Sequence, residues 1–323
     1  MILNIIGNGF DLHHGIRSSY FNFKDYLEDN DSDVFEMIEK YLGNTQNFWY
    51  SFEQNLAYLD EDSILDHASN YLVSYGADDW SDANHHDYQY EIEQITKPLT
   101  SGLQKNFTQW VKQLEISHFK NQLLCFEENS IFLTFNYTST LEKLYGIDET
   151  RILHIHGYVS KEKNELIFGH NYIKPSNNID LEKIKNELGE EAYYEYVEKL
   201  SDGDIRVTEG TEILNSYFTE TFKPTEVIIT ENKVFFEELS KISKITIIGH
   251  SLESVDMPYF EEIVNRINSS EVKWFVHYHK QEDVIKHTQI LIKLGVKKDL
   301  IQNVKIDYFY PSEGVLFSSD DFL

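Results

Sequence analysis

The sequence has little that would tie it to a secreted, membrane-spanning or metal-stabilised class of protein. Its single cysteine, Cys125, excludes an intrachain disulfide framework and a four-cysteine zinc site. It contains no run of about eighteen apolar residues, so no transmembrane helix is predicted. The N-terminus lacks the basic start of a signal peptide, and its apolar stretch ends at once in Gly-Asn-Gly. We therefore expect a cytoplasmic protein with no membrane partner.

Basic residues are also scarce, with 28 Lys and Arg against 55 Asp and Glu and a net charge of −27. A surface this negative repels phosphate backbones, which disfavours nucleic-acid binding. Either a solvated acidic surface or a dock for a basic partner fits this charge, and the sequence does not separate them. Hydrophobic residues make up 41% of the 323 residues, enough for a substantial core.

The first eleven residues carry the most information. An apolar run over 1–6 is broken by Gly7-Asn8-Gly9-Phe10-Asp11. A buried strand that ends in two glycines allows close backbone approach, and the next helix directs its amides at an anion. This pattern favours a phosphate or nucleotide. Leu12 stands where a dinucleotide fingerprint has its third glycine, so an ordinary strand-to-helix turn remains the alternative.

Apolar strands alternate with helical patterns through the rest of the chain, which predicts a parallel sheet covered on both faces. We predict a doubly wound, Rossmann-like α/β fold as a single domain over 1–323. A helical insertion is expected at about 20–125, interrupted by Pro98, and a charged helical insertion or lid at about 180–236. Strands are expected at 1–9, 131–135, 152–155, 166–168, 245–248, 272–277 and 304–308, and helices at 257–267 and 283–294.

Polar residues follow five of these predicted strands, where ligands of parallel sheets bind. Beyond the glycine turn they include Asn136, His156, Gly169-His170-Asn171 and Gly249-His250-Ser251. Each has a plainer interpretation, because an Asn after a strand often caps a helix and a lone His often forms a hydrogen-bonded turn. The repetition at five strand ends favours a common site.

A metal site is the less favoured interpretation of the histidines. His154 and His156 would share one face of an extended strand, which suits a metal. No third ligand follows at a recognisable spacing, and the same objection applies to His277 and His279. We therefore predict no metal.

Four short motifs resemble those of the sirtuins. Gly7-Asn8-Gly9-Phe10-Asp11 is similar to the sirtuin Gly-Ala-Gly-x-Ser, and 134–138 (Thr-Phe-Asn-Tyr-Thr) is similar to Thr-Gln-Asn-x-Asp. His156-Gly157 resembles the sirtuin His-Gly, and 249–252 (Gly-His-Ser-Leu) resembles Gly-Thr-Ser-Leu, which shapes the far side of the NAD pocket. The resemblance implies an NAD-binding α/β fold.

A nearer resemblance is to the AbiH family of phage abortive-infection proteins, and it runs from residue 1 to about 270. It rests on Gly-Asn-Gly-Phe-Asp-Leu, Phe-Asn-Tyr-Thr, His-Ile-His-Gly and Gly-His-Ser-Leu. Further matches are Tyr20, Phe23, Asp256, Tyr259 and Phe260.

The chain departs from the sirtuin pattern in ways that change the implied activity. Cys125 alone cannot build the sirtuin zinc module, so protein deacetylation is not expected. Thr138 replaces an aspartate, and Asp11 replaces a serine. The resemblance then implies an antiviral effector, a hydrolase that cleaves NAD to nicotinamide and ADP-ribose.

The expected site follows from this resemblance. His156, Asn136 and Asp11 are the candidate catalytic residues: a proton acceptor, a ligand of the ribose or water, and an electrostatic stabiliser of the developing cation. The candidate residues for binding NAD, which here is the substrate, are Gly7, Asn8, Gly9, Phe10, Thr134, Gly249, Ser251 and Asp256.

A second function stays open: a non-catalytic module that senses or binds NAD or ADP-ribose and acts with a partner effector. The expected partner is a small-molecule nucleotide. Whether the protein forms a homo-oligomer, or responds to a phage-derived or protein trigger, is left open by the sequence.

Overall fold

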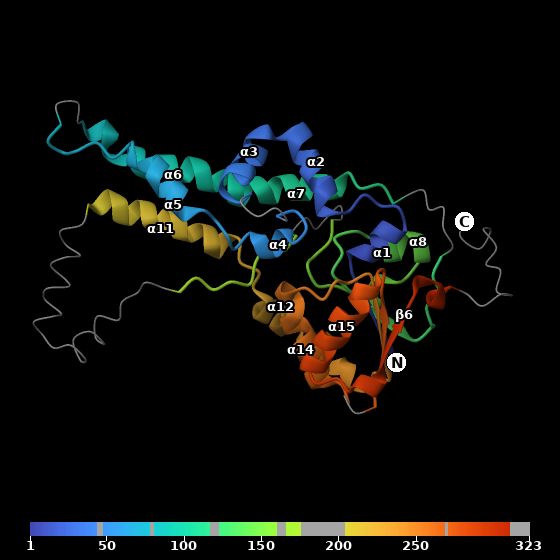
Figure 1. Cartoon of the computed structure of the whole chain (residues 1–323). Helices are drawn as coiled ribbons and strands as arrows, with labels where there is room; N and C mark the ends of the chain where they lie inside the picture. The colour runs from blue at the N-terminus through green and yellow to red at the C-terminus, as the bar shows by residue number, and fades with distance from the viewer. Residues whose placement is uncertain are drawn as a thin grey trace, which may run out of the picture. The chain divides into compact units, whose positions relative to one another are not determined.

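The computed structural model describes residues 1–43, 48–77, 81–116, 123–159, 166–175, 204–268 and 271–310 (Figure 1). The chain divides into two compact units. Unit 1 comprises 1–23, 107–167 and 224–323, and unit 2 comprises 24–106 and 168–223.

The boundaries of unit 2 differ from the insertions expected at about 20–125 and 180–236. The first segment ends earlier because Phe107 packs within unit 1, with its ring 5.1 Å from that of Phe23 and 4.9 Å from that of Tyr137. Of the second expected insertion, 180–203 lies outside the described residues.

Unit 1 is built on a sheet of six parallel strands in the order β3-β2-β1-β4-β5-β6. This is the strand order of the dinucleotide-binding Rossmann sheet, so the predicted doubly wound parallel fold is confirmed. The strands are β1 (Ile2–Ile6), β2 (Ser130–Thr134), β3 (Ile152–His154), β4 (Lys244–Ile248), β5 (Lys273–His277) and β6 (Ile301–Val304).

Both faces of the sheet are covered. Leu3 and Ile5 of β1 point to one face, whose core includes residues of α12, α13, α14 and α15, and Ile6 points to the other, whose core includes residues of α1 and α8. Figure 1 shows α12, α14 and α15 together beside the sheet. The helices of unit 1 are α1 (Asn8–His13), α8 (Thr140–Tyr145), α12 (Thr225–Glu231), α13 (Lys233–Glu238), α14 (Met257–Arg266) and α15 (Gln281–Lys293).

Two strand predictions were wrong. Residues 166–168 form no strand; instead the Ile167 amide donates a single hydrogen bond of 2.9 Å to the His156 carbonyl. The last strand is Ile301–Val304, because the chain turns into a short 3₁₀ helix over Ile306–Phe309. The segment 166–168 is apolar and 304–308 alternates apolar with charged residues, but neither has a strand's full ladder of backbone partners.

The described part of unit 2 is helical. Asp31 caps the helix that follows it by accepting a bond from the Val34 amide, and Val34 and Ile38, one turn apart, are both buried. The predicted interruption at Pro98 is a π-helical turn. The helices are α2 (Tyr20–Asn30), α3 (Ser32–Tyr41), α4 (Phe52–Asn55), α5 (Glu61–Ser69), α6 (Asp87–Lys97), α7 (Leu103–Lys112) and α11 (Ile205–Glu220); α2 and α7 contain the boundary with unit 1.

None of the described helices combines the length and the apolar composition that a bilayer-spanning helix needs.

Candidate functional site

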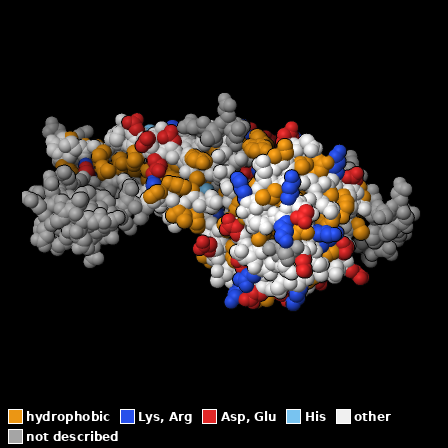
Figure 2. Space-filling view, turned by 60° about the horizontal axis from the view of Figure 1, so that its bottom comes forward, with side chains coloured by type: hydrophobic (Ala, Val, Ile, Leu, Met, Phe, Trp, Pro, Cys, Tyr) orange, Lys and Arg blue, Asp and Glu red, His pale blue; other side chains and the backbone are white. Residues whose placement is uncertain are grey.

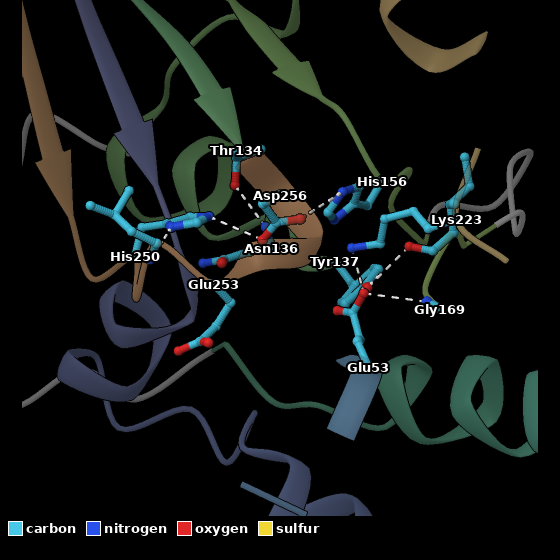
Figure 3. Close-up of polar contacts among 12 residues, drawn as sticks. Glu53, Thr134, Asn136, Tyr137, His156, Gly169, Lys223, His250, Glu253 and Asp256 are labelled. Carbon is cyan, nitrogen blue, oxygen red and sulfur yellow. Dashed lines mark hydrogen bonds and ion pairs between the residues drawn. The ribbon is translucent and has the colours of Figure 1, made fainter. Parts of the chain in front are cut away.

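The predicted polar residues of unit 1 gather at the carboxyl edge of the sheet. Asn136 follows β2, His156 follows β3 and His250 follows β4, while Asp256 comes from the loop before α14 (Figure 3). Asp11 lies on α1, just after β1. Because β3, β2, β1 and β4 are consecutive in the sheet, residues far apart in sequence reach one edge.

Asp11 is buried among hydroxyl groups. Its Oδ2 accepts a bond of 2.6 Å from Thr138, and its Oδ1 accepts one of 2.8 Å from Thr140. Burial raises the pKa of Asp11 to about 6, although the two threonines and the Asn136 amide oppose the rise. An acid that is 1% exposed and already bonded in this way orders its neighbours rather than facing solvent.

The backbone of Asn136 is fixed by a hydrogen bond, whereas its side-chain amide lacks one. Its amide nitrogen donates to the Thr134 hydroxyl at 3.1 Å, which gives Thr134 a role in positioning the loop. The side chain is 5% exposed, and neither Oδ1 nor Nδ2 meets hydrogen-bond geometry with the described residues, although the amide is close enough to Asp11 to lower the pKa of that carboxyl. The capping alternative is excluded, because Ser139 occupies the cap position of α8.

His156 and His250 approach the same carboxylate. Asp256 places Oδ1 at 3.6 Å from Nε2 of His156 and Oδ2 at 3.4 Å from Nε2 of His250 (Figure 3). Both histidines are buried. Asp256, predicted as a nucleotide ligand, therefore belongs to an acid–histidine group that could exchange and stabilise a proton.

An aromatic shell surrounds the two histidines. The Phe135 ring lies 4.3 Å from the His250 ring and 5.2 Å from the His156 ring, edge-on to both. Tyr259 lies 5.6 Å from His156, and Phe260 lies 5.2 Å from His250. These contacts fix the planes of both imidazoles within an apolar environment.

The glycine turn after β1 lies against the turn after β4. A Cβ on Gly9 would lie 2.7 Å from the Gly249 Cα, and one on Gly7 would lie 2.5 Å from the His250 Cα. Gly249 has φ = +70°, and its own Cβ would meet the Phe10 nitrogen. The Gly9 amide donates to the Gly249 carbonyl at 2.8 Å. These glycines let the turns after β1 and β4 touch, and their contact with a pyrophosphate stays a prediction.

The surroundings of three other predicted nucleotide ligands, Phe10, Asn8 and Ser251, differ from one another. Phe10 is fully buried in the core on the α1 side of the sheet, and its contact with a nucleotide stays a prediction. The Asn8 side chain exchanges hydrogen bonds with Ser18, at 2.6 Å to its hydroxyl and 3.0 Å to its carbonyl. Ser251 is exposed and takes no part in the hydrogen bonds described here.

The remaining histidines near strand ends have other roles. His154 pairs with Glu142 at 2.7 Å. His170 lies in unit 2, where its Nε2 is 3.1 Å from the Thr221 hydroxyl and burial lowers its pKa to about 4. Among the described residues, no three His, Cys, Asp or Glu side chains come together as a metal site.

His250 was not among the predicted site residues. The sequence signals were its position between Gly249 and Ser251 at a strand end and its place in the Gly-His-Ser-Leu motif. Its proximity to Asp256 depends on the pairing of β4 with β1 and on the turn that begins α14, which residue patterns do not reveal.

Fold and site together define a Rossmann-like α/β protein with a buried Asn, Asp and His group at the carboxyl edge of its sheet. The family model described as bacteriophage abortive infection AbiH matches residues 3–278. This chain therefore belongs to the AbiH family, and the membership supports a role in phage abortive infection. A search of curated proteins found no match.

Proposed function

We propose that this AbiH chain acts in abortive infection by hydrolysing NAD to nicotinamide and ADP-ribose. The observation that carries the proposal is the buried Asn136 side chain, whose two polar atoms have no hydrogen bond within the described residues. Leaving a buried polar group unsatisfied costs about 1–3 kcal/mol, so such a group is a candidate ligand contact. A ribose hydroxyl both donates and accepts, and so complements an amide.

The reaction breaks the bond between nicotinamide and C1′ of the ribose. Its electron pair goes to the ring nitrogen, so the cationic pyridinium leaves as neutral nicotinamide and needs no general acid. Positive charge develops on the ribose, as in glycoside hydrolysis. The oxygen of a water molecule bonds to C1′ and gives up one proton.

His156 is the proposed acceptor of that proton. An imidazole titrates near neutral pH, and the Asp256 carboxylate, 3.6 Å from Nε2, would stabilise the imidazolium that forms. Separations of this length can shorten when a substrate binds. Asn136 would hold the ribose hydroxyl or the attacking water.

Asp11 has a positioning role in the proposed site and does not contact the substrate. Because both of its oxygens already accept threonine hydroxyls, we assign it to positioning Asn136 rather than to touching the ribose cation. The ribose end of NAD thus fits the residues present. Gly7 and Gly9 lie against the turn after β4, so they are left out of the proposed contacts.

Incubation of the purified protein with NAD, followed by chromatography of nicotinamide and ADP-ribose, tests the proposal. We expect both products from the wild type, and a rate reduced on the order of 10²–10⁴-fold in His156→Ala. A parallel melt with and without NAD tests binding, since a ligand of the folded state raises the melting temperature.

The two measurements also distinguish NAD hydrolysis from the alternative function, non-catalytic binding of a nucleotide. A higher melting temperature with no product, both in the resting protein and in lysates of phage-infected cells, would replace hydrolysis by a nucleotide-binding role. The absence of both a shift and a product would overturn the nucleotide proposal altogether.

A further inference from the structure

The carboxylate of Asp256 is shared between two histidines, and only one of them has a place in the proposed reaction. His156 follows β3 and faces Oδ1, whereas His250 follows β4 and faces Oδ2. His250 is 6% exposed, and thus as well buried as a core residue. A buried histidine beside a buried acid at a proposed active site calls for a chemical explanation.

The backbone fixes the protonation pattern of His250. The Leu252 amide donates a hydrogen bond of 2.9 Å to Nδ1 of His250, so Nδ1 carries the lone pair and the neutral ring carries its proton on Nε2. That proton points to the side of the ring where Oδ2 of Asp256 lies at 3.4 Å. Leu252 adopts φ = +55°, a left-handed conformation unusual for leucine, and it is buried.

The same logic extends to His156 through Asp256. A carboxylate facing Nε2 favours the tautomer that carries a proton there, and the lone pair then lies on Nδ1. Phe135 packs edge-on against both imidazoles, so neither ring turns without disturbing the other.

We propose that His250 is a positioning residue that acts through Asp256 to hold His156 as the Nε2–H tautomer. That tautomer is the form in which His156 takes part in the proposed reaction. The catalytic part of this inference rests on the proposed hydrolysis of NAD, whereas the assignment of the two tautomers does not.

His287 on α15 also interacts electrostatically with His250. Its own neighbours include Asp283, Lys286 and Glu253. The His287→Gln variant removes this neighbour and serves as a control for charge effects from α15.

The first experiment reads the tautomers directly, by ¹⁵N NMR of the histidine rings in the full chain. We expect both His250 and His156 to be protonated at Nε2 in the wild type. His250→Leu should convert His156 to a mixture of tautomers, whereas His250→Gln, which keeps a donor near the Nε2 position, should preserve the wild-type signal. An unchanged His156 signal in a folded His250→Leu protein would overturn the inference.

The second experiment compares the pH dependence of NAD cleavage. We expect kcat/KM to fall about 10- to 100-fold in His250→Leu, the range for losing an outer partner of a functional histidine, with a displaced pH profile. His250→Gln should restore most of the rate. His154→Gln, which removes a histidine paired with Glu142 instead, should keep the wild-type profile, as should His287→Gln.

The two experiments fail in different ways. If the wild type cleaves no NAD, the proposed function is lost while the NMR result still decides the tautomers. If His250→Leu and His250→Gln lose equal stability and activity with no change in pH profile, His250 is only a packing residue.

Discussion

In unit 2 the Lys223 side chain is fully buried, and Glu53 pairs with it while also accepting the Gly169 amide at 3.3 Å. In unit 1 the Asn136 side chain is almost as deeply buried, yet its two polar atoms have no hydrogen bond with the described residues. A matched buried charge is what a stable fold requires, because an unmatched one is costly. The unsatisfied amide has no such structural explanation, and so it points to a ligand.

The two units also differ in charge. Unit 2 contains 10 Lys and Arg against 30 Asp and Glu, whereas unit 1 contains 18 against 25. Figure 2 shows basic and acidic side chains intermixed on the face of unit 1 that it presents. Most of the net charge of −27 therefore belongs to unit 2, and it is a weaker argument against an anionic substrate in unit 1 than the whole-chain value suggests.

The largest effect is expected at the buried pair of unit 2. Glu53→Gln leaves Lys223 buried without its counter-charge, and should lower the free energy of unfolding by about 3–5 kcal/mol. Adding Lys223→Met should recover much of the loss. Denaturant unfolding of the two single variants and the double variant measures this coupling, and purely additive losses would contradict the pairing as the cause.

The second prediction compares two buried amides. Asn136→Ala should lower kcat for NAD cleavage on the order of 10²–10³-fold, with little change in melting temperature, because the side chain has no hydrogen bond of normal geometry with the described residues and only its weaker interaction with Asp11 is lost. Gln89→Ala in unit 2 is the control: Gln89 is equally buried, and its Nε2 donates to Glu209 at 2.7 Å, although its Oε1 has no hydrogen bond with the described residues. That variant should lose stability and keep its activity; the reverse result would refute the functional interpretation of Asn136.

The third prediction concerns two acids whose pKa values move in opposite directions. Hydrogen bonds from Arg206 lower the pKa of Asp204 in unit 2, whereas burial raises that of Asp11 to about 6. The folded state therefore holds the proton of Asp11 more tightly than the unfolded chain does.

Stability contributed by this proton is present below about pH 4 and is lost as the pH rises through 6. The loss is about 3 kcal/mol, taken from 1.36 kcal/mol per pKa unit. Unfolding of the wild type and Asp11→Asn at a series of pH values measures it. Parallel curves for the two proteins between pH 4 and 7 would show that Asp11 is not the group responsible.

The smallest predicted effect is at the glycine turn of unit 1. Gly9→Val should cost about 1–3 kcal/mol of stability, because its side chain would collide with the Gly249 backbone. Gly76→Ala in unit 2 has open space around it and serves as the control. Differential scanning calorimetry compares the two. A Gly9→Val protein that melts like the wild type but no longer responds to NAD would restore the phosphate-cradle interpretation.

Much of the sheet could be predicted because its signals are local. Short apolar runs that end in Gly, Asn or His mark the strands and their carboxyl ends, and parallel pairing brings those ends to one edge. Asn136 and His156 were named from sequence for this reason, whereas Asp256 was named from the resemblance to the AbiH family; all three lie at that edge (Figure 3).

What the sequence could not reveal depends on which strands are neighbours. Gly9 meets Gly249 because β4 pairs directly with β1, across some 240 residues of chain. The two departures from the sirtuin motifs looked independent, yet Thr138 donates its hydroxyl to Asp11. The two positions at which this chain departs from those motifs are therefore in direct contact.

The backbone at the two ends of the segment 168–223 suggests that parts of the chain can be exchanged between proteins of this family. The His170 amide donates to the Thr221 carbonyl at 3.0 Å, and the Lys223 amide donates to the His170 carbonyl at 2.8 Å. The segment thus leaves and rejoins the chain at one point, a geometry that tolerates exchange of whole modules. Because this segment forms one compact unit with 24–106, chimaeras that exchange both parts of unit 2 for those of another AbiH protein offer a route to assigning activities to parts of this family.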